Sequence, residues 1–173
     1  MIKKIVGLGV LLMMISLVGC GNKYNAVVVD SGLVFRKEFL KANRTYGVTY
    51  YNEDYDKDGD RTDEYLVDRM SPKFRTFIIK EQNEFDDIFT DFSTEVNFEK
   101  ELLLIYLFTS VYHRPCKIQS MKLDGETLKI DFKMKNAKPG VKDASVPEQR
   151  YLVIKMKNLD ISAAEFVRLG DGQ

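Results

Sequence analysis

The clearest hydrophobic pattern of this sequence lies between residues 74 and 157. Apolar and polar residues alternate from Thr127 to Lys135, which predicts a strand with one buried face and one solvated face. Leu102–Thr109 is an unbroken apolar run, which is typical of a strand buried on both faces. Asp124-Gly125 predicts a two-residue turn that joins Cys116–Leu123 and Thr127–Lys135 as a hairpin.

The best helical pattern covers Asn83–Phe92. Its apolar residues recur at i, i+3, i+4 and i+7, which predicts one buried stripe: Phe85, Ile88, Phe89 and Phe92. Asn83 is expected to cap the first turn, near the acidic residues that the helix dipole favours there.

Shorter patterns complete the assignment. Val34–Ala42 and Ser162–Phe166 are expected to be helical, and four further strands are expected at Thr45–Tyr51, Glu64–Met70, Phe74–Lys80 and Gln149–Lys157. This order predicts an α+β fold, with an antiparallel sheet or small sandwich on which one amphipathic, Phe-rich helix packs.

The N-terminus has the pattern of a secretory signal. Lys3 and Lys4 precede the apolar run Ile5–Val18, and small residues lead to Cys20. Leu17-Val18-Gly19-Cys20 resembles the bacterial lipobox, which implies cleavage before Cys20 and lipidation of its sulfur. We therefore expect a signal peptide at 1–19, a lipidated Cys20 with a tether over 20–30, and a single domain at 31–173. An uncleaved anchor and plain secretion are the alternatives, and neither gives the cysteine a role.

Charge and cysteine content narrow the function classes. The mature part would carry 26 − 2 = 24 basic and 26 acidic residues, a balance that argues against nucleic-acid binding. Lipidation of Cys20 would leave Cys116 as the sole thiol, so the fold has no internal disulfide. The interval from Glu81 to Glu101 is acidic and that from Arg114 to Lys157 is basic, which predicts either internal pairing or a basic face near an acidic partner or anionic lipid.

The acidic loop between the two predicted strands at 45–51 and 64–70 is a candidate calcium site. Alternating carboxylates followed by Gly59 match the first half of an EF-hand-type loop, whereas the second half departs from that pattern. The candidate ligands are Asp54, Asp56, Asp58, Asp60, Asp63 and Glu64. A solvated polar turn is the alternative.

His113 and Cys116 lie three residues apart, but no signal for an orienting group or oxyanion site accompanies them. The sequence therefore predicts no catalytic residues. Arg114, Arg150 and Tyr151 are the candidates for contact with a protein partner.

The interval 74–157 resembles the PrcB C-terminal-type domain of bacterial lipoproteins. The resemblance rests on Phe85–Phe89, Val96–Lys100 before the apolar strand, Lys138-Pro139-Gly140 and the closing strand from Pro147. Tyr112–Pro115 stands where that family has a Thr-Gly-Gly-Tyr-like segment. The resemblance implies a lipoprotein that supports a surface protease complex without cleaving peptides itself. The Lys-, Ile- and Asn-leaning composition equally suits small lipoproteins of low-GC Gram-positive bacteria.

These observations lead to one functional hypothesis and two rivals. We expect a non-enzymatic lipoprotein, lipid-anchored at the extracytoplasmic face of the cell membrane, which binds another cell-envelope protein. A calcium-dependent ligand-binding or sensing module is the first rival, and a hydrolase is the second.

Overall fold

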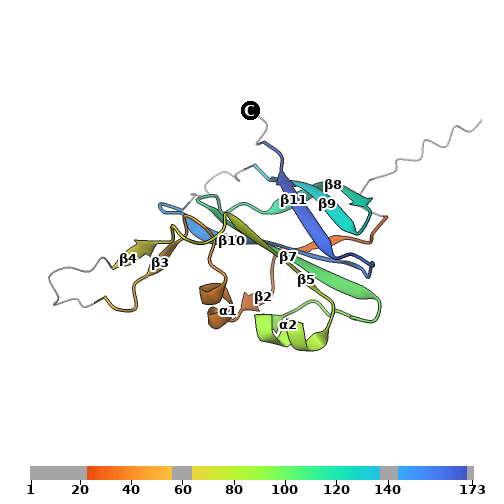
Figure 1. Cartoon of the computed structure of the whole chain (residues 1–173), viewed down its shortest axis with the longest axis horizontal. Coiled ribbons are helices and arrows are strands. Elements are labelled where there is room, and N and C mark those ends of the chain that lie inside the picture. The colour runs from red at the N-terminus through yellow and green to blue at the C-terminus, as the bar shows by residue number, and fades with distance from the viewer. Residues whose placement is uncertain (1–22, 56–63, 137–143, 171–173) are drawn as a thin grey trace, which may run out of the picture.

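A four-stranded antiparallel sheet forms the centre of the molecule (Figure 1). The computed structural model describes residues 23–55, 64–136 and 144–170. The sheet has the order β1 (Val27–Val29), β10 (Glu148–Lys157), β7 (Glu101–Ser110) and β5 (Phe74–Ile79). β10 and β7 pair over ten residues, and this long ladder fixes the two central strands.

The two faces of β7 explain why its sequence is apolar throughout. Alternate side chains point to opposite faces of a strand, and β7 contributes to one core on each side of the sheet. Leu104 faces the first core and Ile105 the second, and both are fully buried. The prediction of a strand buried on both faces is confirmed.

A three-stranded sheet covers the first face, so this half of the molecule is a sandwich. Its order is β11 (Ala163–Arg168), β9 (Thr127–Met134) and β8 (Cys116–Asp124). The hairpin predicted at Asp124-Gly125 is present, and Gly125 has φ of 59°, which glycine adopts at no steric cost. The alternation along β9 buries its apolar face, as predicted: Leu128, Ile130, Phe132 and Met134.

β11 corrects the prediction of a helical turn at Ser162–Phe166. The chain is extended there and pairs in parallel with β9. Phe166 stacks on Tyr106 with a centroid distance of 4.6 Å, so the strand contributes a ring to the first core. The open edge of β9 and this packing outweigh the local helix propensity of the Ala-Ala-Glu sequence.

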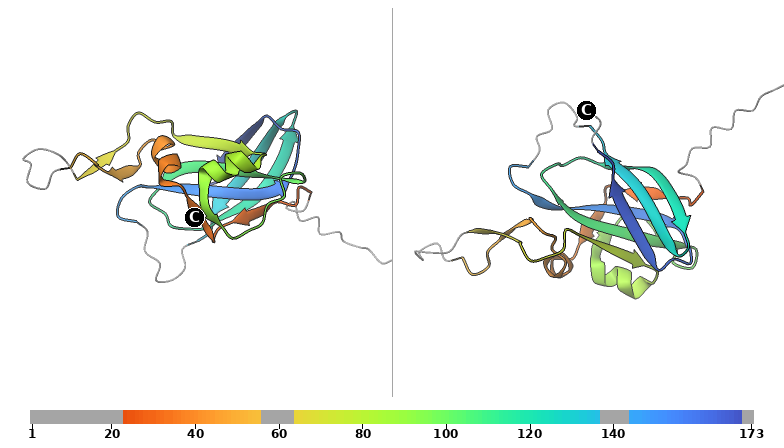
Figure 2. Two further views of the ribbon diagram at one scale, coloured as in Figure 1. Left: turned by 90° about the horizontal axis from the view of Figure 1, so that it is seen from below. Right: turned by 45° about the horizontal axis from the view of Figure 1, so that its top comes forward.

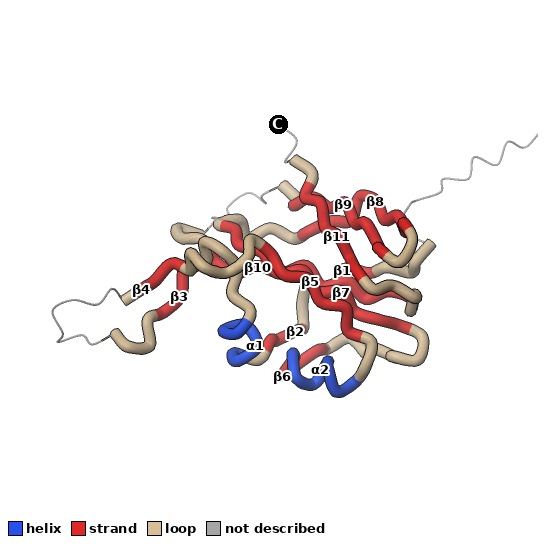
Figure 3. The backbone as a smooth tube through the Cα atoms, in the orientation of Figure 1, coloured by secondary structure: helices blue, strands red, loops and turns tan. Residues whose placement is uncertain are grey.

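Two short helices and a strand pair cover the second face (Figure 3). They are α1 (Lys37–Ala42), α2 (Gln82–Ile88), β2 (Leu33–Phe35) and β6 (Phe89–Phe92). The predicted helix at Asn83–Phe92 is thus wrong in its second half, because the backbone becomes extended at Phe89 and pairs with β2. The helix predicted at Val34–Ala42 likewise begins only at Lys37.

The phenylalanines still converge, although no long helix carries them. Phe85 lies 5.1 Å from Phe89 and 5.2 Å from Phe92 between ring centroids. Asn83 does not cap α2: Glu81 is the N-cap residue, and no side-chain capping bond is made. Strands hold 49% of the described residues and helices 10%, so the predicted α+β class is replaced by a mostly β fold. The predicted sandwich is present, with one parallel pair, β11 and β9, among its otherwise antiparallel strands.

The described part of the predicted tether belongs to the fold. Tyr24 is 4% exposed and lies in the first core, and its carbonyl oxygen accepts a bond of 2.9 Å from the backbone N–H of Lys157. β1 then pairs with β10. The domain thus includes Tyr24 and β1, rather than beginning at residue 31, because the ring of Tyr24 is part of the core.

A separate strand pair projects from the body of the molecule (Figures 1 and 2). It consists of β3 (Thr49–Tyr51) and β4 (Tyr65–Val67), which pair antiparallel. These strands are shorter than the predicted ranges 45–51 and 64–70. We refer to residues 49–55 and 64–67 as the arm.

Candidate functional site

The arm presents aromatic side chains to solvent. Tyr51 and Tyr65 are register partners, and their exposed fractions are 52% and 58%. Their rings meet edge to face at 6.0 Å, and Tyr55 meets Tyr51 at 6.4 Å. An exposed aromatic cluster of this kind is typical of protein-binding surfaces, because tyrosine offers a large contact area at little cost in side-chain entropy.

Backbone hydrogen bonds hold the base of the arm. Thr49 donates to the carbonyl of Pro147 at 2.9 Å, and Gly47 donates to the carbonyl of Asp68 at 2.6 Å. Gly47 has φ of 86°, a conformation that other residues rarely adopt. The hydroxyl groups of buried Thr45 and half-buried Thr109 lie 2.7 Å apart and join this base to β7. The arm is therefore positioned by the central sheet.

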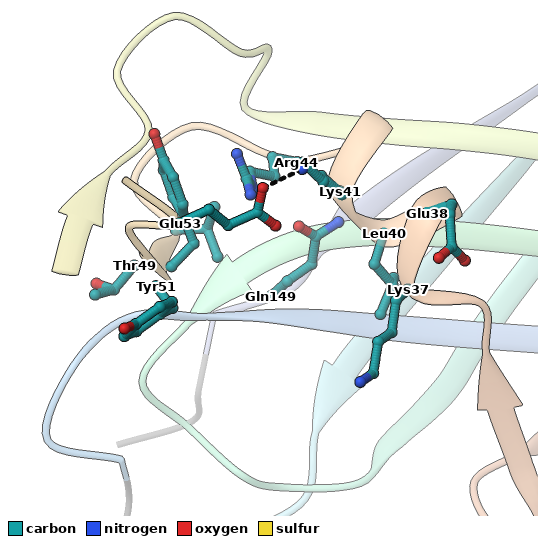
Figure 4. A pocket seen from close by; sticks show the side chains of 11 residues that line it. Lys37, Glu38, Leu40, Lys41, Arg44, Thr49, Tyr51, Glu53 and Gln149 are labelled. Carbon is teal, nitrogen blue, oxygen red and sulfur yellow. Dashed lines mark hydrogen bonds and ion pairs between the residues drawn. The ribbon is translucent and has the colours of Figure 1, made fainter. Parts of the chain in front are cut away.

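A cleft of about 520 Å³ lies between the arm and α1 (Figure 4). Leu40 and Val48 supply apolar wall, and Lys37, Lys41 and Arg44 supply positive charge. Lys41 and Glu53 form an ion pair of 2.5 Å across the cleft. The hydrogen bond and charge of Lys41 hold the pKa of Glu53 below its ordinary value.

A second cation of the cleft, Arg44, is held by the arm itself. The Arg44 guanidinium lies 3.6 Å from the centroid of the Tyr50 ring. Gln149 donates its side-chain amide to the carbonyl of Asn43 at 2.7 Å, which fixes the wall contributed by β10. The cleft can thus accept a side chain with an apolar stem and a hydrogen-bonding or acidic end.

The candidate calcium loop is described only at its two ends. Asp54 and Glu64 are exposed, while Asp56, Asp58, Asp60 and Asp63 lie outside the described residues. The backbone N–H of Asn52 donates to the carbonyl of Glu64 at 2.9 Å, so the arm brings the two ends together. Within the described ranges, no three His, Cys, Asp or Glu side chains are grouped to hold a metal. The calcium site stays a prediction.

The three residues predicted to contact a partner line one pocket. Arg114, Arg150 and Tyr151 surround a volume of about 240 Å³ together with His113 and Cys116. Tyr151 also packs on Phe35 at 4.9 Å, so part of its ring serves the second core. The structure therefore brings the three predicted residues together in a small pocket. None of the residues that line this pocket belongs to the arm.

Cys116 and His113 are engaged in other ways than a nucleophile pair. His113 Nδ1 lies 3.1 Å from Arg150 Nη1, which can only donate, so Nδ1 accepts and Nε2 donates to Glu148 at 2.9 Å. Burial raises the pKa of the Cys116 thiol to about 11. An activated cysteine nucleophile has a lowered pKa and a histidine that accepts its proton. Cys116 has a raised pKa, and both ring nitrogens of His113 are bonded to other residues.

The membrane anchor predicted at Cys20 lies outside the described residues. Within residues 23–55, 64–136 and 144–170, no helix is both long enough and apolar enough to span a membrane. The lipidation site is therefore an expectation from sequence alone.

Sequence reasoning missed Tyr51, Tyr65 and the cations of the cleft. The signal was present, because Tyr50-Tyr51, Tyr55 and Tyr65 flank the acidic loop on both sides. Tyrosines that pair across a predicted hairpin share a face, but the pattern does not tell whether another layer covers that face.

Comparisons with protein families, with curated proteins and with solved structures find no match to this chain.

Proposed function

We propose that this protein is a non-catalytic lipoprotein, anchored through Cys20 to the extracytoplasmic face of the cell membrane, which binds another cell-envelope protein through its arm. The observation that carries the binding role is the exposed, mutually packed pair Tyr51 and Tyr65. Aromatic residues that their own fold leaves more than half exposed gain binding energy when a partner covers them.

The position of the arm supports the same role. The arm lies at one end of the long axis of the molecule, whereas β1 lies toward the other end (Figures 1 and 3). A domain attached to a membrane at residue 20 would present such an arm away from its attachment point.

The cleft at the base of the arm adds specificity to the proposed contact. Lys37 and Lys41 offer ammonium groups beside the apolar wall from Leu40. A partner segment with an acidic side chain would compete with Glu53 for Lys41. Charge complementarity of this kind favours one partner over others more than it adds affinity.

Site-specific photo-crosslinking in the native host tests the proposal. A photoreactive residue at position 65 should crosslink reproducibly to one envelope protein, and the same probe at Leu123, an exposed apolar position outside the arm, should not. Crosslinking at 65 should disappear with Tyr51→Ser, and the purified partner should bind the lipoprotein directly. Equal crosslinking from both positions would contradict the assignment of the arm.

A surface protease complex is one candidate for the partner. The resemblance of the interval 74–157 to PrcB C-terminal-type domains is what suggests that candidate, and identification of the crosslinked protein tests it. If the crosslinked partner is reproducible but unrelated to proteolysis, the binding role is supported and the protease complex is excluded as the partner.

Calcium binding at the end of the arm is the second candidate function. The hydrogen bond between Asn52 and Glu64 favours it, because it holds both ends of the acidic sequence at one place. Calcium at millimolar concentration should then raise the melting temperature relative to chelator, and Asp58→Ala should remove the increase. An unchanged melting temperature would exclude this candidate.

A further inference from the structure

We infer that a polar patch beside Tyr24 lies against the phosphate groups of the membrane to which Cys20 is attached. The inference rests on the proposed lipidation of Cys20. Six exposed side chains form this anchor-side patch: Lys23, Asn25, Asn97, Lys100, Lys157 and Asn158. They contain three ammonium groups and three carboxamides, all of which donate hydrogen bonds to phosphate oxygens.

The first argument is the length of chain between the lipid and the fold. Tyr24 is buried, and its carbonyl is bonded to the backbone of Lys157. Only residues 21–23 separate it from Cys20. Four residue steps span at most about 14 Å even when fully extended. So short a connection keeps the surface around Tyr24 close to the headgroups of a membrane that holds Cys20.

The second argument is that the patch is the surface at the point of attachment. Tyr24 joins β10 at Lys157, and the backbone N–H of Asn158 donates to the carbonyl of Lys100 at 2.7 Å. Asn25 has φ of 50°, so the chain turns immediately after Tyr24. These bonds gather three separate parts of the chain around Tyr24, the first buried residue of the described chain.

The third argument is charge. A hollow of about 610 Å³ is lined by Lys100, Lys157 and the three carboxamides, with two acidic residues at its wall. Glu101 is engaged within the protein, because its carboxylate accepts from the backbone of Asn97 and pairs with Lys155 at 3.4 Å. With Lys23 added, the patch has three positive charges, and Glu99 is the one acidic residue of the hollow that remains to oppose them. The net positive charge favours contact with an anionic surface.

Fluorescence quenching of the full lipidated protein in vesicles tests the inference. A fluorophore is attached at Asn158→Cys or, as the distal control, at Tyr65→Cys, and quenchers are carried on lipid headgroups. Vesicles of phosphatidylcholine with and without phosphatidylglycerol are compared. Quenching at position 158 should be several-fold stronger than at 65, and it should increase with phosphatidylglycerol.

Charge reversal separates recognition from mere proximity. The double variant Lys100→Glu, Lys157→Glu should lose most of the increase caused by phosphatidylglycerol. The matched double variant Lys117→Glu, Lys133→Glu makes the same change in charge at two exposed, paired positions of β8 and β9 and should retain it. Added salt should weaken the response, since exposed charges are screened within about 10 Å at moderate ionic strength.

Three results would overturn the inference. Equal quenching at 158 and 65, with the acyl chains on Cys20 verified by mass spectrometry, would show that the patch does not rest on the membrane. Strong quenching at 158 without any effect of phosphatidylglycerol or of the lysines would show that the short connection alone holds it there. A missing acyl group would refute the anchoring itself, whereas crosslinking at position 65 reports separately on the arm.

Discussion

The central sheet and the arm use similar residues for opposite purposes. β7 and the arm strands are both rich in aliphatic and aromatic side chains. In β7, Leu104 is 0% exposed and packs between two layers, whereas Tyr65 in β4 is more than half exposed and its ring meets that of Tyr51. The difference lies in the surroundings of each strand rather than in its own composition.

This comparison identifies where the sequence serves stability and where it serves function. Burial of apolar surface is the main favourable contribution to folding, so β7 is explained once its two cores are described. Tyr51 and Tyr65, by contrast, are each more than half exposed in the monomer. Their presence needs another explanation, and a binding partner provides one.

The largest expected effect is on the stability of the central sheet. Leu104→Ala removes a side chain from the centre of the first core and should lower the free energy of unfolding by about 2–5 kcal/mol. Tyr65→Ala should change it by less than about 0.5 kcal/mol, as most exposed substitutions do. Urea unfolding followed by circular dichroism measures both. Similar losses in the two variants would remove the distinction between core and arm.

Thiol reactivity should distinguish the same two regions. Cys116 lies in the first core, and its pKa of about 11 stands above an ordinary value of 9.0, so the thiolate fraction near neutral pH should be about 100-fold lower than in the unfolded chain. A cysteine introduced by Tyr65→Cys should react like a free thiol. Alkylation rates measured by mass spectrometry in native buffer and in denaturant test this. Rapid labelling of native Cys116 would contradict its burial.

The central part of the fold could be predicted from sequence because its patterns are local and strong. The alternation in β9, the apolar run of β7 and the turn at Asp124-Gly125 each specify an element with little help from the rest of the chain. These strands also form the longest ladders of the structure. The sandwich could therefore be predicted even though several shorter elements were assigned wrongly.

The elements that were mispredicted depend on contacts between distant residues. β11 is extended because it pairs with β9, and β1 is a strand because it pairs with β10. The spacing of Phe85, Phe89 and Phe92 suits a helix and also suits a short helix followed by a strand that folds the rings together. Local pattern cannot distinguish such cases.

The candidate site was predicted less well than the fold. From the sequence, the acidic residues of the loop were the leading candidate site. In the described structure, the exposed tyrosines beside that loop are the leading candidate. Arg114, Arg150 and Tyr151 were found to share a pocket, which their separation in sequence did not foretell.

A third prediction concerns binding by the arm. Tyr51→Ala and Tyr65→Ala should each weaken binding of the purified partner by at least about 2 kcal/mol, or about 30-fold, if the pair forms the centre of the interface. Leu123→Ala, an exposed apolar control outside the arm, should leave the affinity unchanged. Isothermal titration calorimetry measures the affinities. Equal affinities for all variants would show that the tyrosines do not contribute to the interface.

The smallest effects are expected from two carboxylates, one in each region. The backbone N–H of Asn97 and, further, Lys155 hold the pKa of Glu101 below its ordinary value of 4.5, while partial burial opposes this change. The folded state therefore favours the ionised form. This stabilisation is present above pH 4.5 and is lost as the pH falls through the lowered pKa of the folded state.

Glu53 provides the matched case in the arm. Its pKa is also lowered, by the hydrogen bond and charge of Lys41, but both groups are exposed. Water and salt screen such a pair, so Glu53→Gln should leave the pH dependence of unfolding nearly unchanged. Glu101→Gln should reduce the loss of stability on acidification, because its amide does not titrate. Urea midpoints measured from neutral pH to below pH 4 compare the two variants. A larger change in slope for Glu53→Gln would mean that the arm, rather than the central sheet, couples protonation to folding.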